Sequence, residues 1–118
     1  MRQLGALFIA AAMLTAAACS NKPESSATTN GKPKLRFAVI PKALDIPVFN
    51  YAKIGAERTA KELGNVEILW NAPASGDQLK QKEILESFIT QRVDGIAISC
   101  LNGDFLTDTI NRAIDSGI

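Results

Sequence analysis

Apolar and polar positions along residues 34–118 follow two alternating patterns, one typical of buried strands and one typical of amphipathic helices. Three short runs are almost entirely apolar and are bounded by turn residues, as in strands covered on both faces of a sheet; they lie at 35–40, 66–70 and 94–99. Apolar residues elsewhere recur every three or four positions, which predicts a helix over about 47–63, a second helix that runs to about 92, and a third over about 104–116.

The ends of these predicted helices carry residues that start or stop a helix. Pro47 stands at the opening of the first helix, and Ser75 with Gln78 forms a capping-box pattern ahead of the second. Gly64 and Gly117 follow the first and third helices at the usual left-handed cap position. The residues assigned to the inner face of the first helix are Val48, Ala52, Gly55, Ala56, Ala60 and Leu63. Those assigned to the inner faces of the second and third helices are Leu85, Phe88, Ile89, Leu106, Thr109, Ile110 and Ala113.

Strand and helix alternate three times, which is typical of an α/β fold with a doubly wound parallel sheet. Right-handed crossovers favour the strand order 2-1-3-4 with helices on both faces. Ile118 would be the first residue of the fourth strand, where the sequence stops. We therefore expect residues 34–118 to form part of a larger lobe.

The first 33 residues have a different composition. Residues 1–18 combine one early positive charge, an apolar run and a string of small residues, the pattern of an export signal. Cys19 follows directly and resembles the lipid-bearing cysteine of a bacterial lipobox, although Ala16 replaces the leucine common in that motif. A plain secretory signal with an incidental cysteine is the alternative. Residues 19–33 are rich in Ser, Thr, Asn and Pro, which predicts a lipid anchor followed by a flexible tether.

Charge and residue counts exclude several classes of function. The 13 basic and 12 acidic residues leave a net charge of +1, so there is no basic excess to bind nucleic acid. Histidine is absent, which removes the commonest general base and the commonest transition-metal ligand. If Cys19 carries lipid, Cys100 is the one remaining cysteine and no disulfide framework is possible. We expect no cofactor and no metal.

Ligands of doubly wound sheets bind at the carboxyl ends of the strands, where neighbouring connections diverge. Here the segments at that point are "PKALDIPVF" and "SCLNGD". Lys42 is either a donor to ligand oxygens or a charge that reaches water and ends the strand. Asp45 is a second candidate contact, with helix capping as the alternative. The first loop has no glycine, so phosphate-binding motifs are missing, and no residue pattern indicates catalysis.

Several motifs carry a resemblance to a known family. They are "IPK" after the first strand, the P-x-F helix start, "GAERTAKELG" and "ILESFITQRVDGIAIS". Residues 35–118 resemble the start of type-1, ribose-binding-like periplasmic sugar-binding proteins of ABC importers. "IPK" is closer to the branch that includes autoinducer-2-binding and rhamnose-binding proteins, and the matching lysine of that branch implies that Lys42 contacts the ligand.

The same resemblance implies two further contacts. Ribose-type receptors place an Asn-Pro-Phe-Phe run at the first helix, and only Pro47 and Phe49 of this sequence match it. Phe49 is therefore a candidate stacking platform, with packing against the first strand as the alternative. Ser99, at the end of the third strand, aligns with a polar contact of the ribose-type proteins.

The resemblance implies a lipid-anchored receptor in the periplasm that captures a small sugar or polyol between two lobes and delivers it to a membrane permease. A sensory sugar or autoinducer-2 receptor without transport is the alternative. An effector core of a sugar-responsive transcription regulator would need a DNA-binding head where the export signal stands. A flavodoxin-like enzyme lobe would need a glycine-rich or acidic first loop. Neither pattern is present, and we expect no enzyme activity and no nucleic-acid partner.

Overall fold

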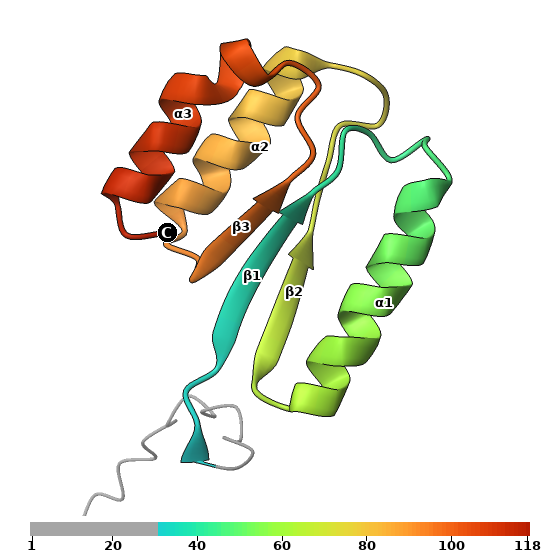
Figure 1. Ribbon diagram of the computed structural model, residues 1–118, viewed down its shortest axis with the longest axis vertical. Coiled ribbons are helices and arrows are strands. Elements are labelled where there is room, and N and C mark those ends of the chain that lie inside the picture. Colours follow the sequence, from blue (N-terminus) through green and yellow to red (C-terminus); the bar gives the residue numbers. More distant parts are fainter. Residues whose placement is uncertain (1–30) are drawn as a thin grey trace, which may run out of the picture.

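The computed structural model of the protein describes residues 31–118, so the predicted signal, Cys19 and the tether as far as residue 30 lie outside the described residues. Six elements alternate along the chain (Figure 1): β1 (Leu35–Ile40), α1 (Val48–Leu63), β2 (Val66–Trp70), α2 (Gln78–Thr90), β3 (Gly95–Ile98) and α3 (Gly103–Asp115). The first two strands have the predicted bounds. Helix α1 ends at Leu63 as predicted, and most other element ends shift by one or two residues, because caps and strand pairing determine them more closely than the apolar pattern does.

The strands form one parallel sheet in the order β2-β1-β3, with β1 in the centre (Figure 1). The connection from β1 to β2 runs toward one edge of the sheet, and the connection from β2 to β3 crosses back over β1 to the other edge. Because both connections are right-handed, α1 and α2 lie on opposite faces of the sheet. The predicted order of these three strands is confirmed. The fourth strand stays a prediction, because Ile118 alone cannot form one; its amide donates to the carbonyl of Ala113 (3.1 Å) and closes the end of α3.

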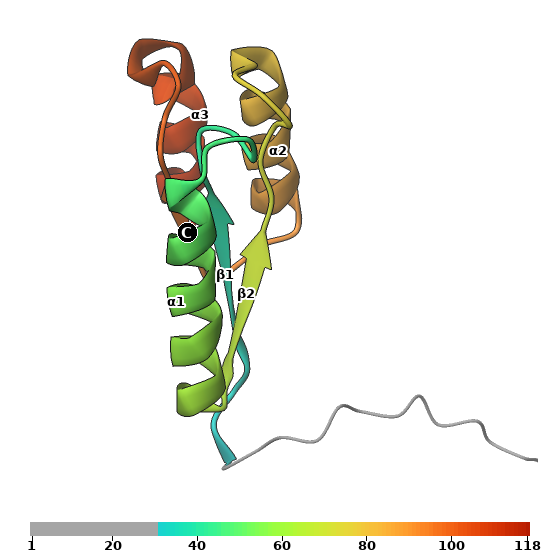
Figure 2. The ribbon, with the colours of Figure 1, turned by 90° about the vertical axis from the view of Figure 1, so that its right-hand side faces the viewer.

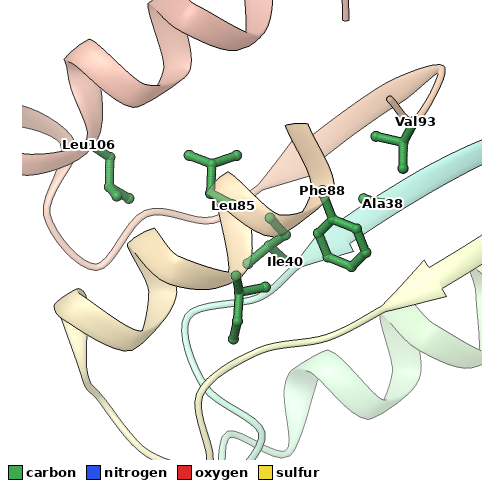
Figure 3. Close-up of a cluster of buried hydrophobic side chains, with 7 residues drawn as sticks. Ala38, Ile40, Leu85, Phe88, Val93 and Leu106 are labelled. Carbon is green, nitrogen blue, oxygen red and sulfur yellow. The ribbon is translucent and has the colours of Figure 1, made fainter. Parts of the chain in front are cut away.

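The hydrophobic core lies between the sheet and the helices α2 and α3, which pack side by side (Figure 2). Ala38 and Ile40 project from β1 into this core and are fully buried. The pattern of the sequence predicted most of their partners correctly. The buried cluster, most of which Figure 3 labels, comprises Ala38, Ile40, Ile84, Leu85, Phe88, Val93 and Leu106.

The opposite face of the sheet is more open. Helix α1 packs against β2 and buries Ala60, whereas Val48 and Leu63 of its predicted inner stripe are 62% and 58% exposed. On this face the ring of Phe37 lies against Gly95 of the neighbouring strand, and a Cβ added at Gly95 would lie 2.8 Å from the ring. Only glycine fits there without displacing the aromatic ring.

Helices α2 and α3 each begin at a side chain that caps them. Asp77 accepts a hydrogen bond from the amide of Lys80 (2.9 Å), and Asn102 caps α3 in the same way (3.1 Å). The predicted capping box of Ser75 and Gln78 is therefore wrong. Asp77 directly precedes the helix, and its short carboxylate reaches the amide three residues on, as a cap requires.

Left-handed residues end all three helices. Gly64 and Gly117 have φ values of 76° and 82°, which confirms the predicted glycine caps. Arg92 takes the corresponding place after α2 with a φ of 51°, although it is not glycine. The amide of Val93 donates to the carbonyl of Phe88 (3.5 Å) around this turn, which gives α2 a Schellman ending.

Candidate functional site

Three loops follow the carboxyl ends of the strands, and we call them together the carboxyl edge: residues 41–47, 71–77 and 99–102. Connections diverge at the central strand β1, so the place where ligands bind in such sheets lies between β1 and β3. Three of the four predicted ligand contacts belong to the carboxyl edge, and the fourth follows it in α1. Lys42 and Asp45 stand in the first loop, Phe49 in the first turn of α1 that follows, and Ser99 at the start of the third loop.

Main-chain hydrogen bonds join these loops to one another. The amide of Leu44 donates to the carbonyl of Pro73 (2.9 Å) and so connects the first loop to the second. The amide of Ser99 donates to the carbonyl of Ile40 (2.9 Å), which continues the pairing of β1 and β3 to the edge. The backbone on which Lys42 and Ser99 stand is therefore fixed from both sides.

One buried side chain adds a further connection between the first and third loops. Gln81, in the second turn of α2, is 0% exposed. Its Nε2 donates to the carbonyls of Pro41 (3.1 Å) and Ser99 (3.0 Å), and its Oε1 accepts from the amide of Leu101 (2.9 Å). Both amide hydrogens and the amide oxygen are thus used.

The two charged candidates of the first loop are exposed. Lys42 directly follows the buried Pro41 and forms no ion pair within residues 31–118, so its ammonium group is available to a ligand and equally to water. Asp45 is not a helix cap, which corrects that alternative. Helix α1 begins after Pro47, whose backbone is already helical, and no side chain bonds to its first amides.

Phe49 and Ser99 are both half-buried. Phe49 lies on α1 and is not a member of the core cluster between the sheet and α2, so the alternative that its ring packs against β1 on the α1 face is not tested by that cluster. The hydroxyl of Ser99 makes no hydrogen bond to residues 31–118, although both main-chain groups of Ser99 are bonded. Every buried side-chain oxygen or nitrogen in this part of the chain has a partner, so the Ser99 hydroxyl is open to solvent and to a ligand.

A second pair of charges lies at the start of α2. The ammonium of Lys80 donates to the carboxylate of Glu83 (2.7 Å), and this hydrogen bond is the main cause that raises the pKa of Lys80. Lys80 therefore stays charged at neutral pH. Because the pair is exposed, it contributes little to stability.

The chemical groups at the carboxyl edge suit a small polar ligand. An ammonium, a carboxylate and a hydroxyl supply donors and acceptors, and the ring of Phe49 belongs to the first turn of the helix that follows. Residues 31–118 hold no group of three or more His, Cys, Asp or Glu side chains that could bind a metal ion. Within the same residues, no helix has both the length and the apolar character needed to cross a membrane.

Comparison with known families adds a decisive observation. Residues 37–118 match the periplasmic binding protein domain family, which is most of the part that the structure describes. The chain belongs to this family. Membership implies a location in the periplasm, and the family consists of binding proteins and not of enzymes, as the sequence analysis predicted.

Solved periplasmic binding proteins share the fold. A 5-methylthioribose transporter solute-binding protein from Thermotoga lettingae is 37% identical with a TM-score of 0.65; the match covers 71% of this chain and 26% of the chain of that protein. A solute-binding protein from Burkholderia graminis in complex with D-arabinose is 35% identical with a TM-score of 0.65, and the match covers 73% of this chain and 29% of that one. LsrB from Clostridium saccharobutylicum in complex with AI-2, at 20% identity and a TM-score of 0.67 over 71% and 26%, shows likeness of fold alone.

This periplasmic binding protein domain thus spans less than a third of the length of these structures. Its structure brings together the backbone of the loops that carry Lys42 and Ser99 through shared hydrogen bonds. Asp45 and Phe49 are linked to them only through the chain itself and the first turn of α1.

Sequence reasoning missed Gln81. A signal was present, because Gln81 precedes Ile84, Leu85 and Phe88 at the three-, four- and seven-residue spacing of the buried face of α2. A polar residue in such a stripe must find hydrogen-bond partners in the core. Those partners lie 18 to 40 residues away along the chain, so the pattern predicts a bonded side chain but does not identify the bonds.

Proposed function

We propose that the protein is the substrate-binding lipoprotein of an ABC sugar importer, which captures a small sugar or sugar-like polyol and delivers it to a membrane permease. The observation that carries this proposal is the family match over residues 37–118. Two structural neighbours that are more than a third identical are solute-binding proteins of transporters and hold 5-methylthioribose and D-arabinose. Both ligands present several hydroxyl groups.

The carboxyl edge supplies groups that fit such ligands. The ammonium of Lys42 donates to sugar oxygens, and the hydroxyl of Ser99 both donates and accepts. Asp45 accepts from sugar hydroxyls, and the ring of Phe49 offers an apolar surface to one face of the sugar. A second lobe closes over the ligand by a hinge, which excludes water and strengthens these hydrogen bonds.

Lipidation at Cys19 would hold the protein at the membrane beside its permease. The small residues before Cys19 and the polar segment after it support this part of the proposal. One tether of this kind raises the concentration of the binding lobe near the permease without adding any contact.

A thermal-shift screen of the full-length mature protein tests the proposed ligand class. The panel contains pentoses, hexoses, deoxysugars, 5-methylthioribose and autoinducer-2, each at a high concentration. A ligand present at about a hundred times its dissociation constant adds about 2.7 kcal/mol of stability, which is a clear rise in Tm. A selective rise with one or a few sugars is expected, and a protein that responds to none of them would contradict the proposed function.

Uptake of the labelled ligand separates transport from sensing. Cells that lack the gene should lose high-affinity uptake of the ligand that the screen identifies, and the gene should restore it. Normal uptake in the deletion strain, together with tight binding in vitro, would show a receptor without a transport role.

A further inference from the structure

Gln81 is not among the side chains that could contact a ligand, although it bonds to the loops that carry those side chains. It is fully buried, lies on α2 and touches no solvent, yet its amide bonds to both loops between which the ligand site lies. We infer that Gln81 is a positioning residue for ligand binding, which sets the spacing of the Lys42 loop and the Ser99 loop. This inference rests on the proposed function, because it assigns Gln81 a task at that same site.

The hydrogen bonds of Gln81 fix the relative position of two loops, in addition to any contribution they make to the stability of the fold. The two hydrogens of Nε2 point about 120° apart in the amide plane, and each is directed to a carbonyl of a different loop. The carbonyls of Pro41 and Ser99 are therefore held at a fixed separation across one nitrogen atom. The Oε1 atom of the same side chain accepts a hydrogen bond from the amide of Leu101, which adds a second bond to the third loop.

The bonded atoms are neighbours of the candidate contacts. Pro41 precedes Lys42 directly, so the carbonyl that Gln81 binds belongs to the peptide bond that leads into Lys42. The carbonyl of Ser99 belongs to the residue whose hydroxyl is open to the ligand. A displacement of either carbonyl rotates the adjoining residue and moves its side chain relative to the other loop.

Other side chains of similar size do not reproduce these bonds. Methionine has nearly the same length and would fill the space, but it offers no donor to either carbonyl. An ionised glutamate has acceptors alone and would repel both carbonyls, whereas a protonated one keeps a single donor and an acceptor. A substitution such as Gln81→Met therefore keeps the core filled but removes the hydrogen bonds that orient the loops.

The test uses the full-length protein with Gln81→Met, and Val93→Ala serves as the matched control. Val93 is buried in the same core at the opposite end of the sheet, so its truncation lowers stability without touching the carboxyl edge. Dissociation constants for the sugar found in the thermal-shift screen are measured at a temperature where every variant is folded. Gln81→Met should bind at least about tenfold more weakly than wild type, and Val93→Ala within about twofold.

Hydrogen exchange of the Leu101 amide provides a measurement that needs no ligand. This amide is protected in the wild type because it donates to Gln81, and we expect its exchange to accelerate by about tenfold or more in Gln81→Met. The amides of α3 should keep their order of protection in both variants. Unchanged protection of Leu101 would overturn the role of the side chain in the loops.

Rescue by pH gives a second variant in case Gln81→Met does not fold. Gln81→Glu should bind poorly at about pH 9 and recover part of its affinity relative to wild type as the pH falls to about 5, because burial beside two carbonyl oxygens raises the pKa of a carboxyl and it regains its proton within this range. A ratio of affinities that is constant with pH contradicts the inference.

The outcomes distinguish this inference from the function on which it rests. A wild-type protein that binds no solute overturns the proposed function and the ligand role of Gln81 with it. A wild type that binds sugar, with a Gln81→Met variant that binds as tightly or loses no more than Val93→Ala, overturns the inference alone.

Discussion

Lys42 is a charged residue at the end of a strand whose neighbours are buried. It is exposed, follows Pro41 at the carboxyl edge and forms no ion pair within residues 31–118. Lys42→Ala in the full-length protein should weaken sugar binding by about 10- to 100-fold, the worth of a hydrogen bond from a charged donor. Stability should change by less than about 0.5 kcal/mol, as for other exposed residues. Calorimetric titration and urea unfolding measure the two effects.

Lys61→Ala is the control for this prediction, because Lys61 is exposed on α1 far along the chain from the carboxyl edge. It should leave both affinity and stability close to wild type. If Lys42→Ala binds sugar as tightly as Lys61→Ala, Lys42 merely ends the strand in water and has no ligand role.

At the scale of single residues, the sequence predicted where a residue lies better than it predicted which groups its side chain bonds to. Lys42 and Ser99 lie at the carboxyl edge as expected, because the ends of apolar runs mark the ends of strands. The caps were harder: Asp77 caps α2 in place of Ser75, and Asp45 caps nothing. Gln81 was missed because its bonds join segments that are distant in the sequence.

At the scale of elements, helix α2 ends with a backbone conformation that suits glycine better than arginine. Arg92 has a φ of 51°, which costs a residue with a Cβ roughly 1 kcal/mol or more. Arg92→Gly should therefore raise the free energy of unfolding by about 0.5–1 kcal/mol, after allowance for the greater freedom of glycine in the unfolded chain. Urea or thermal unfolding of the full-length protein measures the change.

Arg58→Gly provides the same chemical change in the middle of α1, where the backbone is helical. It should lower stability by about 1 kcal/mol. Equal losses in both variants would mean that the turn after α2 does not favour glycine.

The elements were predicted well wherever burial gives a strong pattern. The bounds of β1 and β2 were correct, and Leu85, Phe88 and Leu106 are buried as expected. The stripe on α1 was less informative: Val48 and Leu63 share a face with Ala60, yet only Ala60 is buried. An apolar stripe identifies the inward face of a helix, but the area buried depends on what else packs there.

At the scale of the whole molecule, the predicted anchor can be tested with the two cysteines of the chain. Cys19→Ser should move the mature protein from the membrane fraction to the soluble fraction of the cell envelope, because it removes the residue that would carry lipid. Cys100→Ser should leave the distribution unchanged, since Cys100 packs beside the core in the folded domain. Detergent partitioning and immunoblotting measure both.

A Cys19→Ser protein that stays with the membrane would contradict lipidation at this position. Release of the Cys100→Ser protein, with Cys19→Ser retained, would contradict it more directly.

The fold of residues 31–118 followed from the sequence because three strand–helix repeats and right-handed crossovers permit few arrangements. The site followed only in outline. The carboxyl edge is a property of topology, but the connections among its loops depend on individual hydrogen bonds such as that between Leu44 and Pro73. Those bonds join residues whose proximity is created by the fold itself.

The side chain of Gln81 bonds only to main-chain atoms, and every residue type except proline offers the same amide and carbonyl. Substitutions of Lys42 or Ser99 therefore leave these bonds available, whatever side chain replaces them. On the proposed function, a change of side chain at Lys42 or Ser99 that alters solute preference needs no compensating change at Gln81.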